Sequence, residues 1–410
     1  MLGAGVFVVW GPAAAAAGSW LLAAVALAAV VAIINAASTA QLAAIHPVAG
    51  GAYAYGSREI GPVWGFIAGF AFVVGKIASV AAMSLAVGAY VWPGHASVVA
   101  VGVVALVWAL NARGVTRTAW ATTAIAGVVL VGLAAVVATS LSLPVDSARA
   151  AAARTGGAHA LEAQPIEVTG VATAAALIFF AFAGYARLAS LGEEVRQPAK
   201  TIPRAITIAI AIVVVTYGAI AVVVLRSPGV AALVGAEAPL SLAVPDVAAW
   251  RSALAALAAL AAGGALVALM AGIGRTTMAM ARAGDLPRVL GRTGRSGVPQ
   301  LAEAVAGGAA VMLAWWADLG FALAMSSVSI LVYYAVANAA AFAARGRASS
   351  FAIPRAVSAL GVALCLALAA SLDAVPTLAA LGAGALAVAV RAVIARLRNP
   401  RVESHGASRG

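Results

Sequence analysis

Long apolar segments dominate the chain, and short turns that contain polar residues, glycine or proline separate them. A helix rises about 1.5 Å per residue, so about 20 apolar residues cross a hydrocarbon layer of about 30 Å. The pattern predicts an all-α polytopic membrane protein with about twelve transmembrane helices. They lie near residues 1–18, 20–45, 63–91, 96–112, 117–142, 171–190, 205–225, 250–281, 299–317, 320–343, 353–371 and 375–396.

Glycine interrupts two of these segments. The first contains Gly3-Ala4-Gly5, and in the sixth Gly184 lies among aromatic residues between Phe180 and Tyr185. Opening a helix in lipid costs several kcal/mol for each exposed N–H or C=O, unless protein, water or ligand binds the group. Close packing of two helices at glycine is the alternative interpretation. Interruptions at corresponding places in two halves indicate the central site of a transporter.

The charge distribution supports a membrane protein and sets its orientation. Only 9% of the 410 residues are charged, whereas a soluble globular protein has about 25%. The net charge of +12 would suggest nucleic-acid binding in a soluble protein, but 17 of the basic residues fall in loops on one side of the predicted membrane and 4 on the other. The positive-inside rule places the richer side in the cytoplasm. We therefore expect a multi-pass protein of the cell inner (cytoplasmic) membrane, with the lipid bilayer and no nucleic acid as partner.

Catalytic and metal-binding patterns are not found in the sequence. Cys365 is the single cysteine, and the four histidines are far apart. The segment from Gly69 to Lys76 lacks the spacing and the Ser or Thr of a phosphate-binding loop, so Gly65 and Gly69 are better interpreted as a helix-packing motif. We predict no enzyme, no metal and no cofactor.

Five motifs carry a resemblance to a known family. They are Gly3-Ala4-Gly5-Val6-Phe7, His46-Pro47-Val48-Ala49-Gly50-Gly51-Ala52-Tyr53, Phe179-Phe180-Ala181-Phe182-Ala183-Gly184-Tyr185, Gly192-Glu193-Glu194-Val195-Arg196-Gln197-Pro198 and Met280-Ala281-Arg282-Ala283-Gly284-Asp285-Leu286-Pro287. In these motifs the chain resembles the amino acid, polyamine and organocation (APC) permease superfamily, bacterial amino acid permeases above all. The match extends from Gly3 to about Gly297.

The resemblance implies a LeuT-like fold of two inverted five-helix repeats plus two C-terminal helices. The implied units are the first repeat 1–142, an extracellular loop 143–170, the second repeat 171–343, the last two helices 344–398 and a cytoplasmic tail 399–410. Only Met1 and Leu2 precede the first glycine, so we expect the first helix to be truncated in this sequence.

The resemblance also implies a substrate site at the two broken helices. Backbone N–H groups at Gly3, Ala4 and Gly5 would receive a substrate carboxylate, helped by the helix dipole. Carbonyls around Phe180 and Ala183 would accept the ammonium group. The other binding candidates are Phe182, Gly184 and Tyr185, with ordinary packing as the alternative for the two aromatic residues.

The implied function is secondary active transport of amino acids by alternating access. Small or apolar substrates are favoured, because no acidic residue lies in the spans near the expected pocket. The alternatives are an amino acid exporter or exchanger, and a non-transporting sensor or truncated remnant of the fold. The oligomeric state stays open.

Charged residues within or beside the spans provide the coupling and gate candidates. Lys76 lies 12 residues beyond Trp64, about 18 Å along the third span. A lysine at mid-membrane should face a cavity or partner, either as a coupling or electrostatic group or as a support for a broken helix. Ser79 and Met83 share its helix face.

The coupling ion is H⁺ or Na⁺. Some relatives have an acid where this chain has Ala186, and some have a lysine in the fifth helix, which here carries no charge. Thr276 and Thr277 are weak sodium candidates. The inner gate candidates are Arg187, Glu193 and Glu194.

Overall fold

The computed structural model describes residues 3–48, 50–113, 119–144, 167–185, 197–226, 229–294, 297–344 and 352–398. Within these ranges all regular structure is helical. The α-helices are α1 (Gly5–Val8), α2 (Trp10–Ala17), α3 (Leu21–Ile45), α4 (Gly51–Glu59), α5 (Pro62–Val91), α6 (Ala96–Ala112), α7 (Ala119–Ser142), α9 (Val168–Phe182), α11 (Pro198–Arg226), α12 (Gly229–Leu233), α13 (Ala248–Ala283), α14 (Gln300–Trp316), α15 (Leu319–Ala343), α16 (Arg355–Ser371) and α17 (Ala374–Arg398). The 3₁₀ turns are η1 (Gly18–Trp20), η2 (Ala183–Tyr185), η3 (Pro239–Ala243) and η4 (Arg288–Gly291).

The long helices coincide with the apolar segments of the sequence. Eight stretches of the described residues are long and apolar enough to cross a membrane, and α6 and α16 are apolar but shorter. Large apolar side chains are exposed on the outer surface of the bundle, among them Trp120 at 80% and Trp316 at 82%. Such an apolar surface suits contact with lipid tails. The helices suit the lipid interior as well, because all backbone hydrogen bonds of a spanning helix are internal. The all-α polytopic membrane fold is therefore confirmed.

Local sequence signals set several helix ends. Pro62 starts α5, at the position where its missing N–H costs nothing. The Asp318 carboxylate accepts the Phe321 N–H at 2.7 Å and caps α15. Gly284 ends α13 with a φ of +90°.

One helix begins earlier than expected from the sequence. The apolar pattern predicts a helix over residues 205–225, but α11 already starts at Pro198 and includes Lys200 and Pro203. Proline at the first helical position suits a helix start. Hydrophobicity alone misses this first part, because it is polar.

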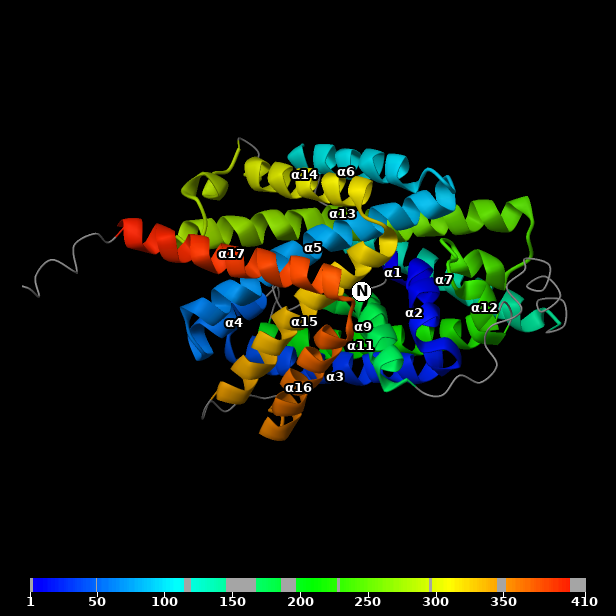
Figure 1. Ribbon diagram of the computed structural model, residues 1–410, viewed down its shortest axis with the longest axis horizontal. Helices are drawn as coiled ribbons and strands as arrows, with labels where there is room; N and C mark the ends of the chain where they lie inside the picture. The colour runs from blue at the N-terminus through cyan, green and yellow to red at the C-terminus, as the bar shows by residue number, and fades with distance from the viewer. Residues whose placement is uncertain are drawn as a thin grey trace, which may run out of the picture.

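Helix α5 is central to the packing. It contacts α15, α13, α6, α4, α14 and α17, and Figure 1 shows it between α13 and α15. Gly65 and Gly69 face α4 so closely that added Cβ atoms would lie 2.6 Å from the Tyr53 carbonyl oxygen and 2.9 Å from its ring, respectively. The predicted packing role of these two glycines is thus confirmed.

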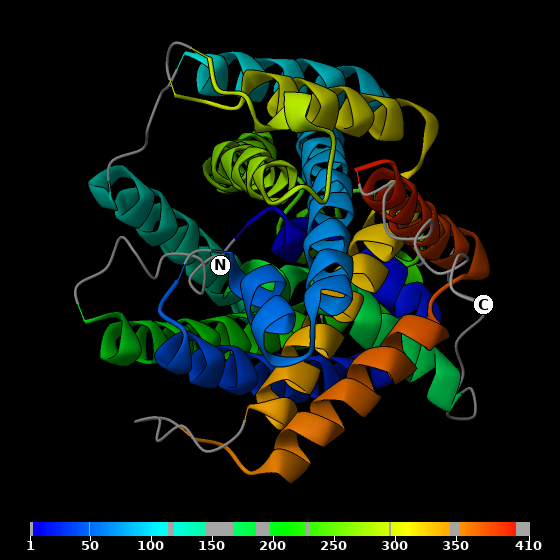
Figure 2. The same ribbon diagram turned by 90° about the vertical axis from the view of Figure 1, so that its left-hand side faces the viewer.

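The remaining helices surround this centre. In Figure 2, α6 and α14 lie together at one edge of the bundle and α16 lies at the opposite edge. Figure 1 shows α4 and the C-terminal part of α17 at one end of the molecule and α12 at the other. The α4 end carries Arg58 and Arg282, so it is the end expected in the cytoplasm.

Candidate functional site

The first glycine-containing segment forms a helix start. The Val9 N–H donates to the Gly5 carbonyl at 3.1 Å and the Ala13 N–H to the Val9 carbonyl at 3.0 Å, so α1 and α2 run on as one helical segment. Gly3 precedes it and is not helical. The N–H groups of Gly5 and Val6 stand in the first turn, where no carbonyl of the helix precedes them. They give this end a partial positive charge.

The second segment changes its helix type where the sequence predicts a break. Helix α9 ends at Phe182, and residues 183–185 form the 3₁₀ turn η2. The Ala183 N–H donates to the carbonyls of both Phe179 and Phe180. The Tyr217 hydroxyl on α11 donates to the Ala181 carbonyl at 2.9 Å. The regular α-helical bonding ends here, and η2 continues it with the tighter i→i+3 bonds of a 3₁₀ turn.

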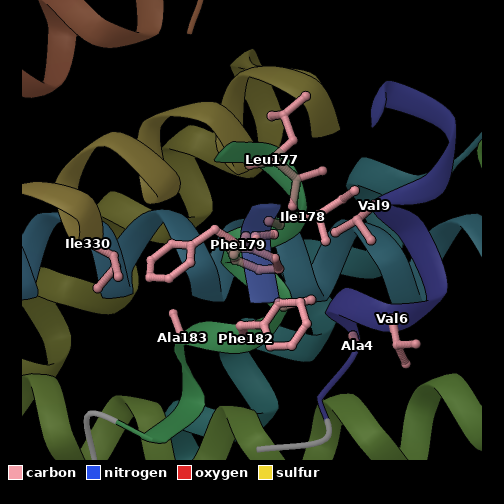
Figure 3. Packing of buried hydrophobic residues seen from close by; sticks show 14 of the residues in the cluster. Ala4, Val6, Val9, Leu177, Ile178, Phe179, Phe182, Ala183 and Ile330 are labelled. Atoms are coloured by element: carbon pink, nitrogen blue, oxygen red, sulfur yellow. The ribbon is translucent and has the colours of Figure 1, made fainter. Parts of the chain in front are cut away.

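These two helix ends touch each other. A Cβ added at Gly5 would lie 3.0 Å from the Ala181 Cβ and 3.1 Å from the Phe180 ring. A Cβ added at Gly3 would lie 3.1 Å from Met83 Cε on α5. Figure 3 shows the start of α1, with Ala4, beside Phe182 of α9. The structure thus brings the candidates of both segments together.

The two aromatic candidates beyond this contact are packed inside the protein. Phe182 is 0% exposed and meets the Tyr217 ring edge to face at 4.9 Å. Tyr185 is also 0% exposed, with its ring 5.0 Å from that of Tyr334 on α15. Phe180, by contrast, turns an edge toward Gly5. Of the three aromatic rings, Phe180 is therefore the one that lies against Gly5, while Phe182 lies beside Ala4 (Figure 3).

Lys76 lies inside the bundle on α5. It is 6% exposed, and its Nζ lies 5.8 Å from the centre of the Phe72 ring. It forms no ion pair within the described part of the chain. On the same face, Ser79 pairs with Ser326 of α15 at 2.8 Å, and Met83 reaches Gly3. Lys76 and the residue that contacts the start of α1, Met83, thus lie on the same face of α5.

The sodium candidates lie on α13, where Thr277 is buried and Thr276 is partly exposed. No group of three His, Cys, Asp or Glu side chains with metal-binding geometry occurs in the ranges described above. The gate candidates Arg187, Glu193 and Glu194 lie outside the described residues.

A buried acid that sequence reasoning did not select lies on α14. Glu303 is 1% exposed, and a Cβ added at Gly274 of α13 would lie 2.6 Å from its Cγ. Arg275 on α13 interacts with it electrostatically. The sequence could not identify Glu303 as buried, because an acidic residue in the first turn of a helix is usually exposed to solvent and looks the same in the sequence.

Three side chains join distant segments at the end of the bundle that we expect to face the cytoplasm, and we call them the cytoplasmic lock: Tyr53, Asp285 and Arg391. The Tyr53 hydroxyl of α4 donates to Asp285 Oδ2 at 2.9 Å, and Arg391 Nε of α17 donates to Asp285 Oδ1 at 2.6 Å. The Arg391 guanidinium also lies 5.2 Å from the centre of the Phe66 ring. Burial and the hydrogen bond to Asp285 raise the pKa of Tyr53, so its hydroxyl stays a donor at physiological pH.

Two further bonds hold α4 in place. The Ala52 N–H donates to the Tyr333 hydroxyl of α15 at 3.1 Å. His46, which follows α3, binds the Glu59 carboxyl through Nε2. Both Ala52 and His46 belong to a motif that the sequence analysis singled out, but their partners could not be read from that motif.

These features define a polytopic helical membrane protein in which two glycine-marked helix ends meet. Comparison of sequences gives the family: the chain belongs to the amino acid permease family, whose profile matches residues 1–393. The resemblance inferred from the short motifs is thereby confirmed. The family is one of transport proteins.

Individual relatives cover most of the chain. An uncharacterized transporter of Mycobacterium tuberculosis is 46% identical over 97% of this chain and 89% of its own length. Cationic amino acid transporter 7 of Arabidopsis thaliana, described as chloroplastic, is 27% identical over 83% of this chain and 62% of its own. A branched-chain amino acid permease of Bacillus subtilis is 27% identical over 59% and 55%, respectively.

Proposed function

We propose that the protein carries amino acids across the cytoplasmic membrane by alternating access, and that the substrate binds where the start of α1 meets the end of α9. The contact of Gly5 with Phe180 and Ala181 is the observation that carries this proposal. A transporter of this class holds its substrate between two interrupted helices, and one side of the membrane opens at a time.

Main-chain groups would recognise the part that all amino acids share. The N–H groups at Gly3, Ala4 and Gly5 would bind the carboxylate at the positive helix end. Carbonyls around Phe180 and Ala183, at the end of α9, would accept the ammonium group with the lone pairs that the helical bonds leave free. The side chain of the substrate would then extend toward Met83 and its neighbours.

We further propose that the substrate has a small or apolar side chain. The side chains that surround Gly3 and Gly5 are those of Met83, Ala265, Phe180 and Ala181, all without charge. A cationic side chain would need an acidic partner there. Competition between labelled leucine and unlabelled arginine or alanine tests this point, and stronger inhibition by arginine than by alanine would contradict it.

The central test is uptake into proteoliposomes with an imposed proton or sodium gradient, which also identifies the coupling ion. We expect saturable uptake by the wild-type protein, a reduced rate for Gly5→Ala and no uptake for Gly5→Leu. Gly102→Leu is the matched control, since Gly102 is exposed on α6 with no atom within 4 Å of an added Cβ. Uptake by folded Gly5→Leu at the wild-type rate would contradict the proposed site.

A further inference from the structure

One face of α15 carries a row of buried polar side chains. Ser327, Tyr334 and Asn338 are spaced seven and four residues apart, which places them on the same side of the helix. Each is 0% exposed. Within the described part of the chain, Ser327 Oγ, the Tyr334 hydroxyl and Asn338 Oδ1 have no hydrogen-bond partner. Such groups are rare inside proteins, because each has lost its water.

Two other helices add polar groups to this row. Asn338 Nδ2 donates to Asn35 Oδ1 of α3 at 2.6 Å and to the Tyr334 carbonyl at 2.9 Å. The Cys365 thiol of α16 donates to the same Asn35 oxygen at 3.3 Å. Exchanging the oxygen and nitrogen of either amide would place two donors or two acceptors against each other. The other ends of the two amides, Asn35 Nδ2 and Asn338 Oδ1, therefore stay unpaired.

The row reaches the end of α9. The Tyr185 ring in η2 packs on Tyr334 at 5.0 Å, and its hydroxyl lies near Asn35 and Tyr334. This hydroxyl is buried, and its approaches to Asn35 and Tyr334 do not reach hydrogen-bond geometry within the described residues. Unpaired atoms from α3, α15 and η2 thus gather around one place behind the turn.

The chemistry of these atoms selects a ligand. Asn35 Nδ2 can only donate, Asn338 Oδ1 can only accept, and the hydroxyls can do both. A metal ion needs acceptors and prefers carboxylates, and none is present in this group. Water both donates and accepts, and a buried water has two to four polar partners. We propose that Asn35, Tyr185, Tyr334 and Asn338 form an internal water site behind the end of α9. The site is independent of the proposed substrate and goes beyond the transport function.

Polar pairs connect this site to the cytoplasmic end. Along α3, Ser38 lies one turn after Asn35, and its Oγ is 3.4 Å from Ser358 Oγ of α16. Nearly one turn further, Gln41 Oε1 accepts the Ile353 N–H at 3.0 Å. Polar contacts thus continue along α3 from the water site to Gln41.

Radiolytic footprinting of the full-length protein in lipid nanodiscs tests the site, because X-rays convert bound water to hydroxyl radicals that modify adjacent side chains. We expect modification of Tyr185 and Tyr334, with ¹⁸O incorporated from labelled water. Tyr217 is the matched control, since it is also 0% exposed but its hydroxyl binds the Ala181 carbonyl. Modification of Tyr185 and Tyr334 as low as that of Tyr217 would show a dry cluster and overturn the proposal.

A second measurement uses Tyr334→Phe, which removes only the hydroxyl. A site that holds water loses a partner, so we expect weaker modification of Tyr185 and a Tm lowered by about 1–3 °C. In a dry cluster the same change would remove an unsatisfied group, and the Tm would rise or stay unchanged while Tyr185 modification would not change. That result would also overturn the proposal.

Discussion

Both the backbone conformation and the surrounding space require glycine at position 51. Its φ is +54°, and an added Cβ would lie 2.6 Å from the Tyr333 hydroxyl. We expect Gly51→Ala to lower the free energy of unfolding by about 2–4 kcal/mol, from backbone strain and from displacement of Tyr333. Unfolding in detergent measures the loss.

Gly94 separates the two causes. It also has a positive φ, +80°, but no atom lies within 4 Å of an added Cβ. Gly94→Ala should therefore cost only about 1 kcal/mol. Equal losses for the two variants would show that the Tyr333 contact contributes nothing.

Lys76 is the coupling candidate that a single substitution can test. We expect Lys76→Met to fill the same space without the charge and to lower gradient-driven accumulation of substrate by about tenfold or more, which corresponds to about 1.4 kcal/mol of coupling. Exchange of labelled for unlabelled substrate needs no net movement of the coupling ion, so it should continue. Proteoliposomes with and without a gradient distinguish the two activities.

Ser79→Ala is the control on the same face of α5. It removes the bond to Ser326 but no charge, so both activities should persist. If Lys76→Met accumulates substrate like the wild-type protein, Lys76 has only a structural role.

At the scale of elements, the cytoplasmic lock predicts that α4 and α17 stabilise each other through Asp285. Tyr53 and Arg391 bind different oxygens of the same carboxylate. A double-mutant cycle with Tyr53→Phe and Arg391→Gln should give a coupling free energy of about 0.5–3 kcal/mol. Unfolding of the four proteins in detergent measures it.

An exposed ion pair serves as the comparison for this cycle. Arg251 and Asp246 lie 3.4 Å apart with side chains that are 66% and 85% exposed. Solvent screens such a pair, so its own cycle should give no coupling beyond the error of the measurement. A similar absence of coupling in the Tyr53 and Arg391 cycle would contradict the lock.

Individual elements could be predicted better than the contacts between them. Apolar length predicts α5, α13 and α15, and the glycine among aromatic residues predicts the change of helix type after Phe182. The partners of Asp285 could not be predicted, because Tyr53 is 232 residues away and Arg391 is 106 residues away. Arg391 lies in an apolar segment whose sequence predicts a spanning helix but gives no sign of an ion pair with Asp285.

For the candidate site, too, the residues could be predicted but their contacts could not. The motifs name Gly5 and Phe180, but their contact depends on how α1 packs on α9, which no local pattern contains. The contact of Asn35 with Asn338 spans 303 residues. Single polar residues in apolar segments carry no signal that identifies their partner.

At the scale of the whole molecule, the distribution of arginine predicts the orientation in the membrane. A Cys365→Ser protein provides the background for single cysteines at exposed positions. We expect Arg58→Cys in α4 to react with an impermeant thiol reagent only after the cells are permeabilised, and His95→Cys to react in intact cells. The opposite labelling pattern would reverse the orientation.

The cytoplasmic lock also has a consequence for the order of biosynthesis. Arg391 is made 106 residues after Asp285, which at about 5–20 residues per second delays their ion pair by about 5–20 s. During this interval Asp285 has Tyr53 but not Arg391, and the attachment of α4 to the loop after α13 is incomplete. Helix α17 therefore completes the closure of this end only after the preceding helices have been made, and a nascent chain that stops before α17 would keep this end loose.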